Sequence, residues 1–209
     1  MNIAVFGGTG VTGQLVIERA LAEGHSVAAL TRDASRIIRS SDRVRVVEGS
    51  PTSPADVRRT VEGADAVIHC LGIGGKGDGK ASTLVSESVG LVIDEAVRSG
   101  VKRIVCMSNV GAGGSGPWLY RRIVLPIFLS WLRPIIADKD RMEELLRSSG
   151  LEWVSVRLPN IVDGPGRPIR ASASGAGLGL SITAASVAEF LVGQVSSSEW
   201  VGQTPSISN

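Results

Sequence analysis

The sequence has few cysteines, histidines and aromatic residues. Its 209 residues include 2 Cys, 2 His and 4% aromatic residues. Cys70 and Cys106 both lie in apolar runs, so we expect reduced thiols in a core and not a disulfide scaffold. Neither His25 nor His69 has a partner at metal-ligand spacing. We therefore predict no metal site and a structural role for both histidines.

An excess of one charge and a long apolar run are also missing. The chain has 22 basic and 20 acidic residues, a net charge of +2, and no run of Lys and Arg, so nucleic acid is not an expected partner. The most apolar stretch, residues 123–132, contains Pro126 and is shorter than the roughly 20 residues that a membrane-spanning helix needs. The first residues do not resemble a signal peptide. We expect no membrane span and a cytoplasmic protein.

Short runs rich in Val, Ile and Ala alternate with segments of helical period. Runs that predict strands are 2–6, 26–31, 43–48, 65–71, 102–107 and 152–157. Segments that predict helices are 11–23, 82–99 and 138–149, with Asp138 as a candidate N-cap of the last. This alternation predicts an α/β fold with a single doubly wound parallel sheet in one domain spanning residues 1–209.

Residues 158–181 are rich in Gly, Pro, Ser and Ala and predict a long loop after the last of these strands. Such a loop lines a ligand crevice in many α/β sheets, although it is an idle excursion in others. We expect residues 158–209 to complete the substrate side of a crevice.

The strongest local motif is the glycine cluster from Gly7 to Gly13, which reads GGTGVTG. It follows the strand 2–6 and opens the helix 11–23, as a dinucleotide-binding turn requires. Glycines permit a tight turn, and the amide groups of the helix N-terminus then face a pyrophosphate. The motif predicts a dinucleotide site.

The end of the second predicted strand bears on which dinucleotide binds. An Asp or Glu about 20 residues after the glycines contacts the ribose 2'-hydroxyl in NAD sites. Here Arg32 and Arg36 stand in this region, and a guanidinium binds a 2'-phosphate bidentately. We therefore expect NADP(H) to be preferred over NAD(H). Asp33 keeps NAD possible, although it is also a candidate N-cap of the next helical turn.

Six segments carry a resemblance that covers nearly the whole chain: IAVFGGTGVTGQ, LTRDASR, GADAVIHCLG, GVKRIVCMSN, DKDRMEELLRSSGLEWVSVRLPNI and SITAASVAEFLV. The sequence resembles the atypical short-chain dehydrogenases/reductases with an NAD(P)-binding Rossmann fold. Within them it is most similar to the biliverdin-IXβ reductase/flavin reductase branch, with NmrA-like proteins as more distant relatives.

The resemblance implies roles for individual residues. Those implied to contact the cofactor are Gly7, Thr9, Gly10, Val11, Thr12, Arg32, Arg36, Ser50, Leu71, Gly72, Ile73, Ser108, Pro159, Asn160 and Ile161. Ser108, at the end of the fifth predicted strand, corresponds to the serine near the nicotinamide and is the candidate catalytic residue. Trp118 and Asn160 are candidates to line the substrate. Ser50 and Asn160 depart from the family, which commonly has Asp and His at these places.

The Tyr-x-x-x-Lys pair of many short-chain dehydrogenases is missing. Tyr120 is followed four residues later by Val124, and Lys139 is preceded four residues earlier by Ile135. We interpret Lys139 as a helix-surface lysine. The missing pair favours hydride transfer to a small planar acceptor that needs little acid catalysis, such as a flavin, a bilin or a quinone.

Two other functions remain open at this point. A non-catalytic, NmrA-like protein would bind NADP and report redox state to a partner, and an isomerase or epimerase would belong to the same superfamily. The apolar segment 123–136 discriminates between them, because lining of the nicotinamide pocket favours an enzyme and an exposed patch favours a protein partner. Trp118, Phe128 and Trp131 fit a substrate wall, a subunit contact or a core equally well. For the assembly, we expect a monomer or a weak homodimer.

Overall fold

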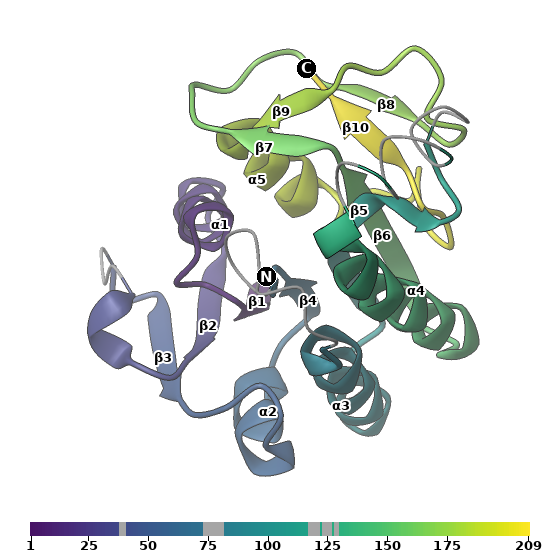
Figure 1. Cartoon of the computed structure of the whole chain (residues 1–209). Helices are drawn as coiled ribbons and strands as arrows, with labels where there is room; N and C mark the ends of the chain where they lie inside the picture. The colour runs from purple at the N-terminus through teal and green to yellow at the C-terminus, as the bar shows by residue number, and fades with distance from the viewer. Residues whose placement is uncertain (38–40, 73–81, 117–121, 123–126, 128–129) are drawn as a thin grey trace.

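The computed structural model describes residues 1–37, 41–72, 82–116, 122, 127 and 130–209 (Figure 1). The strands are β1 (Asn2–Phe6), β2 (Ser26–Thr31), β3 (Val44–Glu48), β4 (Ala66–His69), β5 (Arg103–Gly113), β6 (Glu152–Leu158), β7 (Asn160–Val162), β8 (Arg170–Ser172), β9 (Ser181–Thr183) and β10 (Ser206–Ser208). The α-helices are α1 (Val11–Ala22), α2 (Pro54–Val61), α3 (Leu84–Ser99), α4 (Arg133–Ser148) and α5 (Ala184–Gly193), and the short 3-10 helices are η1 (Ala34–Arg36) and η3 (Ser130–Leu132).

The main sheet has the order β3-β2-β1-β4-β5-β6-β10-β8. Its strands pair in parallel from β3 to β10, and only β8 runs antiparallel, against β10. The order reverses between β1 and β4, so the chain winds outward in both directions from the centre. The predicted doubly wound α/β fold is confirmed, and it is a Rossmann fold.

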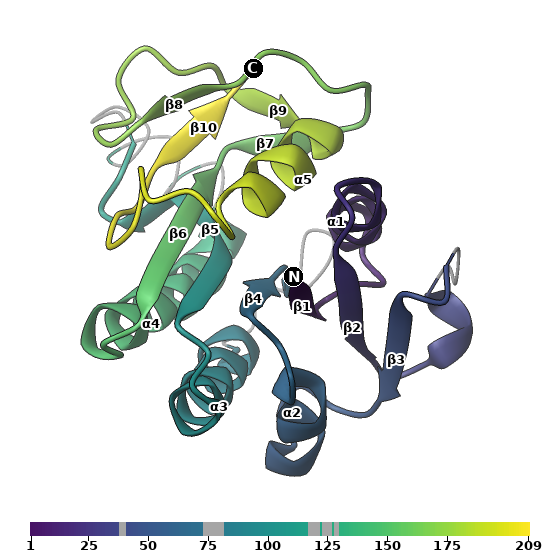
Figure 2. The ribbon, with the colours of Figure 1, turned by 180° about the vertical axis from the view of Figure 1, so that it is seen from behind.

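Each face of the sheet packs on its own set of helices. In β1, Ile3 and Val5 belong to the core shared with α1 and α5, whereas Ala4 and Phe6 belong to the core shared with α2, α3 and α4. The split follows from the period of two in a strand, which points successive side chains to opposite faces. Figures 1 and 2 show the two helical layers from opposite sides, with α1 and α5 on one face and α2, α3 and α4 on the other.

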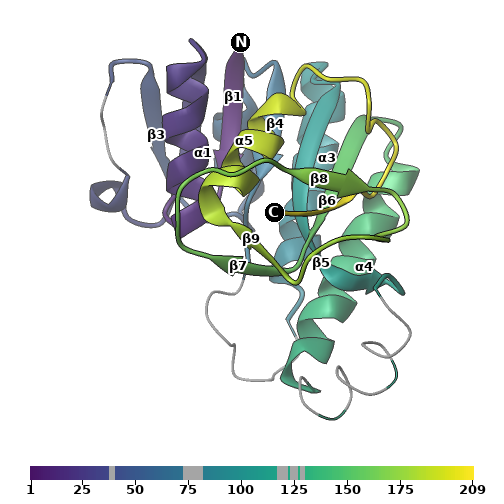
Figure 3. The same cartoon turned by 90° about the horizontal axis from the view of Figure 1, so that it is seen from above.

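Three predicted boundaries are wrong. The helix predicted from 138 begins at Arg133, five residues earlier, with Pro134 in its first turn, where the fixed φ of proline suits a helix start. The strand predicted to end at 107 continues to Gly113, so Ser108 lies inside β5. The segment 158–181 is not one loop, because β7 and β8 form within it and β7 pairs with β9 in a separate two-stranded sheet (Figure 3).

Cys70, Cys106 and His69 are buried, and His25 is half-buried. Cys70 and Cys106 are free and buried, and burial raises the pKa of each thiol to about 12. His69 is fully buried, its Nε2 lies 3.0 Å from Oγ of Ser88, and burial lowers the pKa of its imidazole to about 3. His25 contacts the N-terminal amine at the surface. Over the described ranges there is no group of three or more His, Cys, Asp or Glu side chains placed to hold a metal ion.

None of the helices in the described part of the chain has both the length and the apolar character to cross a bilayer.

Candidate functional site

The glycine loop joins β1 to α1 at the carboxyl edge of the sheet. Gly7 has a φ of +83°, and a Cβ placed there would lie 2.8 Å from the carbonyl carbon of Cys70. A Cβ on Gly13 would collide with the carbonyl oxygen of Gly7. Only glycine fits these two places, because the loop packs against both the end of β4 and the first turn of α1.

The N-terminus of α1 carries no cap of its own. Its N-cap is Gly10, no side chain hydrogen-bonds to the cap position, and the first turn has no acidic residue. The first amide groups of a helix need partners, and together with the helix dipole they favour an anion. Val11, at the first helical position, is 64% exposed, so the approach to these amides is open. The loop therefore fits the pyrophosphate of a dinucleotide.

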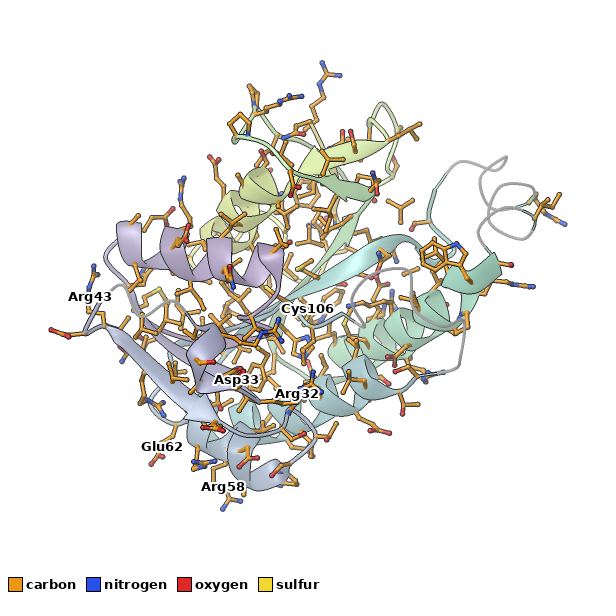
Figure 4. The ribbon with its side chains drawn as sticks, turned by 60° about the vertical axis from the view of Figure 1, so that its left-hand side comes forward. Arg32, Asp33, Arg43, Arg58, Glu62 and Cys106 are labelled. Atoms are coloured by element: carbon orange, nitrogen blue, oxygen red, sulfur yellow. The ribbon has the colours of Figure 1, made fainter. Side chains whose placement is uncertain are left out.

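Arg32 and Asp33 follow the carboxyl end of β2 (Figure 4), and Arg36 ends the short helix η1 that comes next. All three are exposed. Asp33 Oδ1 accepts hydrogen bonds from the backbone N–H and the hydroxyl of Ser35, at 3.0 and 2.6 Å, and these bonds lower the pKa of the carboxyl group. Asp33 is thus the N-cap of η1, as predicted. Among the described residues of this turn, Arg32 and Arg36 are the cationic ones.

Ser50 follows β3 at the same edge. Its backbone N–H donates to Oδ2 of Asp56 at 2.9 Å, and its hydroxyl lies 2.9 Å from that of Thr52. The side chain is half-buried and belongs to the turn that opens α2.

A cavity of about 970 Å³ lies at the ends of β4 and β6 and beside the middle of β5. It brings together six of the residues that the resemblance implied: Leu71, Gly72, Ser108, Pro159, Asn160 and Ile161. The glycine loop, Arg32, Arg36 and Ser50 are not part of its lining and lie along the same strand edge toward β3. Ile73 and Trp118 lie outside the described residues.

The cavity wall is largely apolar. The helix η3 contributes Trp131 and Leu132, and the first turn of α4 contributes Ile135 and Ile136. The chain after β6 contributes Ile161, and the stretch before β9 contributes Leu178 and Leu180. The described end of the apolar segment 123–136 therefore lines the cavity, and in that segment Ile127 is 65% exposed.

Lys139 does not lie on the helix surface. It is 3% exposed and lines the cavity. Its Nζ donates to the carbonyl oxygens of Leu71 at 3.1 Å and Met107 at 2.6 Å. Burial lowers the pKa of this ammonium to about 8. The prediction that Lys139 lies on the helix surface is wrong, because α4 directs this side chain toward β4 and β5.

Asp138 is not the N-cap of its own helix. It lies within α4, is 2% exposed, and accepts hydrogen bonds from the backbone N–H groups of Val85 at 3.0 Å and Ser86 at 3.2 Å. These are amides of the first turn of α3, so Asp138 caps a neighbouring helix. This contact ties α4 to α3 beside the cavity.

Ser108 belongs to a buried polar network on the α4 side of the sheet. Its hydroxyl donates to Oε1 of Glu143 at 2.9 Å, and Glu143 is fully buried. The same carboxylate accepts from Nε of Arg157 at 3.0 Å, from its terminal nitrogen at 2.6 Å, from Arg147 at 3.0 Å and from Ser155 at 3.3 Å. Because the hydroxyl proton of Ser108 is engaged by Glu143, its oxygen is left to accept a hydrogen bond from a ligand.

Sequence reasoning missed Lys139 and Glu143 as buried groups. The signal that would have found them is helical spacing, because both share a face with Ile136, Met142 and Leu146, all of which are buried. Charged residues on an apolar helix face are candidates for paired, buried positions.

The parallel sheet, the uncapped glycine loop and the cavity at the carboxyl edge define an NAD(P)-binding Rossmann protein. The chain belongs to the NAD(P)H-binding family, whose model matches residues 7–198. This match and the fold confirm the NAD(P)-binding Rossmann family that the resemblance implied, and solved proteins described as short-chain dehydrogenases/reductases share the fold.

Three similar proteins illustrate the relationship. The photosystem II assembly factor Ycf39 of Guillardia theta is 26% identical over 165 residues, which cover 78% of this chain and 48% of Ycf39, so the chain spans about half of that relative. A short-chain dehydrogenase/reductase from Veillonella parvula DSM 2008, solved in complex with NADP, superposes with a TM-score of 0.82 at 16% identity and covers 100% of this chain and 94% of its own. ChuY from Escherichia coli O157:H7, described as an anaerobillin reductase, has a TM-score of 0.79 at 23% identity, covering 100% and 97%.

Proposed function

We propose that this protein is an NADP(H)-dependent reductase that transfers hydride to a small planar acceptor of the flavin, bilin or quinone type. The observation that carries the proposal is the apolar cavity of about 970 Å³ beside the glycine loop, at the edge where a Rossmann fold holds its nicotinamide. Its size suits a nicotinamide and an acceptor together. Bound NADPH would supply the hydride, and the protein would hold the two reactants in contact.

The cofactor half of the proposal rests on the carboxyl edge of β1 to β4. The pyrophosphate would lie on the amides of the loop Gly7–Thr12, and the 2'-phosphate on Arg32 and Arg36. Two observations support NADP over NAD: both arginines are exposed at this edge, and the Asp33 carboxylate already accepts two hydrogen bonds from Ser35. Ser50 would contact the adenine, and Leu71, Gly72 and Ile73 would pass the ribose.

The acceptor half rests on the cavity wall. Pro159, Asn160 and Ile161 would lie against the nicotinamide, and Ser108 would orient it by accepting from its amide. Trp131 and Ile135 would flank the acceptor, with Trp118 as a further candidate. Because the described end of the segment 123–136 lines the cavity, it favours an enzyme over a redox sensor whose apolar segment would face a partner protein.

The first experiment is steady-state oxidation of NADPH by the purified protein with FMN, biliverdin and menadione as separate acceptors, and with NADH in parallel. We expect turnover with at least one acceptor and a preference for NADPH. Tight NADPH binding without turnover on any acceptor class would contradict the reductase and favour a sensor.

The cofactor preference has its own test in Arg32→Ala. Removal of a guanidinium that binds a 2'-phosphate should weaken NADPH binding by about ten- to a hundredfold, since charge-assisted hydrogen bonds contribute about 1.5–3 kcal/mol. NADH binding should change little. Equal losses for both cofactors in fluorescence titrations would show that Arg32 does not contact the 2'-phosphate.

A further inference from the structure

The cavity has few groups able to move a proton. Among its described lining residues, the ionisable side chains are Cys70, Asp138 and Lys139. Burial keeps the Cys70 thiol protonated, because it raises the pKa to about 12. The Asp138 carboxylate is engaged by the amides of Val85 and Ser86. Lys139 is the remaining candidate to give up a proton.

Two carbonyl oxygens of the described residues hold the ammonium of Lys139 in place. Two of its three N–H groups donate to the carbonyl oxygens of Leu71 and Met107, and the described residues offer no third acceptor. Those two carbonyls anchor Nζ between the end of β4 and the middle of β5, beside Ser108. A buried donor without a partner is costly unless a ligand accepts from it. At a cavity wall, this N–H is placed to donate to a carbonyl oxygen of a bound molecule.

The surroundings of Lys139 favour titration near neutral pH. Burial is the main cause that lowers its pKa to about 8, and Cys106, Asp138, Cys70 and Glu143 oppose it in part. His69 faces it from β4 and stays neutral, because burial lowers the pKa of the imidazole to about 3. An acid works best when its pKa lies close to the operating pH. An ordinary surface lysine would hold its proton too tightly.

The usual proton donor of this fold class is replaced by an apolar side chain. Ile135 stands four residues before Lys139, where the Tyr-x-x-x-Lys pair has its tyrosine, and Ile135 lines the same cavity. Tyr120, the one tyrosine in the sequence, lies outside the described residues. The position from which a phenol would protonate the acceptor therefore carries no proton.

We propose that Lys139 itself donates the proton that completes the reduction of the acceptor, in place of a tyrosine. The proposal rests on the reductase function proposed above. A bound nicotinamide cofactor would supply the hydride, which would convert a quinone-type acceptor to its monoanion. The Nζ–H bond of Lys139 then breaks as an O–H bond forms on the acceptor oxygen, and the reduced acceptor leaves neutral. The amine that remains takes a proton from solvent before the next turnover.

The test uses Lys139→Ala, with Lys102→Ala as the matched control because Lys102 is exposed just before β5. Menadione is the acceptor and NADPH the donor. We expect kcat of Lys139→Ala to fall about 100-fold, the lower end of the usual contribution of a general acid. Added methylammonium should restore part of this loss in proportion to its concentration, because it fits the space left by the side chain. Lys102→Ala should behave as wild type.

Two readouts separate proton donation from mere positioning. In the protein without cofactor, NMR of the lysine ammonium groups should find one that titrates near pH 8 and is missing in Lys139→Ala. The variant Lys139→Arg keeps the positive charge but does not release its proton, so its kcat should stay low. The wild-type rate should fall above pH 8, where Lys139 loses its proton. In Lys139→Arg this fall should be absent. Fluorescence titration of each variant with NADPH reports any loss of cofactor binding separately.

The outcomes distinguish this proposal from the function on which it rests. A wild type that turns over while Lys139→Ala keeps its rate overturns proton donation and leaves the reductase standing. Loss of turnover in Tyr120→Phe, with no rescue of Lys139→Ala by methylammonium, assigns the proton to Tyr120 and also overturns the proposal. A wild type without turnover on any acceptor overturns the proposed function itself.

Discussion

The burial of Lys139 makes a prediction about stability that is independent of any enzymatic activity. The structure lowers the pKa of this ammonium from the ordinary value of 10.5 to about 8. In the unfolded chain the lysine is exposed to water and recovers its ordinary pKa. The unfolded state therefore binds the proton more tightly, and the free energy of unfolding must depend on pH between these two values.

The sign and size follow from this difference. Below pH 8 the lysine is charged in both states and the cost of burying the charge is fully present; above about 10.5 it is neutral in both and the cost is gone. The two pKa values differ by an amount worth about 3 kcal/mol at 1.36 kcal/mol per pKa unit. Most of this difference develops between pH 7 and pH 10. The stability of the wild type should rise by this amount relative to a variant without the charge.

The perturbation is Lys139→Met, which keeps most of the side-chain volume and removes the ammonium. Urea denaturation at pH 7, 8, 9 and 10 measures the free energy of unfolding of wild type, Lys139→Met and the exposed control Lys102→Met. We expect the difference between wild type and Lys139→Met to change with pH, while Lys102→Met follows wild type. The loss of hydrogen bonds to Leu71 and Met107 adds a constant offset that does not depend on pH. If the free energies of unfolding of wild type and Lys139→Met change with pH in parallel, the conclusion that Lys139 is buried with a lowered pKa is wrong.

Two further predictions concern its neighbours. Ser108→Ala should lower kcat more than it weakens NADPH binding, because the hydroxyl oxygen would orient the nicotinamide while most of the affinity comes from the phosphates; unchanged kcat in steady-state assays would remove Ser108 from the mechanism. Asp138→Ala should lower the free energy of unfolding by about 1–2 kcal/mol, the usual value of an N-cap, because two amides of α3 lose their partner. Urea denaturation beside Asp94→Ala, an exposed change on α3, measures this, and equal effects of both variants would show that the cap contributes nothing.

Local patterns in the sequence predict the framework of this protein well. The central strands β1, β4, β5 and β6 are short apolar runs in the sequence because most of their residues are buried on both faces of the sheet. This pattern can be recognised without knowing which strands are neighbours. The glycine loop can also be predicted from the sequence, because its glycines are required by contacts between residues close in the chain, such as that of Gly13 with Gly7. The N-cap role of Asp33 is local too, because its partner Ser35 lies two residues away.

The groups that set the chemistry of the cavity depend on contacts between distant segments. Asp138 looks like the start of its own helix, yet its partners are amides more than fifty residues earlier in the chain. Lys139 resembles a surface lysine in the sequence, and only the fold places the end of β4 and the middle of β5 around it. The sequence predicts Ser108 at the end of a strand. Its hydroxyl donates a hydrogen bond to Glu143 only because α4 packs on β5 and β6.

The sequence by itself therefore determined the fold class, the nicotinamide-dinucleotide family and the edge of the sheet where ligands would bind, because strand burial and tight turns act over short stretches of chain. The tertiary structure alone decided which charges are buried at that edge and what they hydrogen-bond. The local sequence around a charged side chain looks the same whether the side chain is exposed to solvent or lines a cavity. Its burial, its pKa and its hydrogen-bond partners depend on distant segments that come into contact with it only in the folded chain.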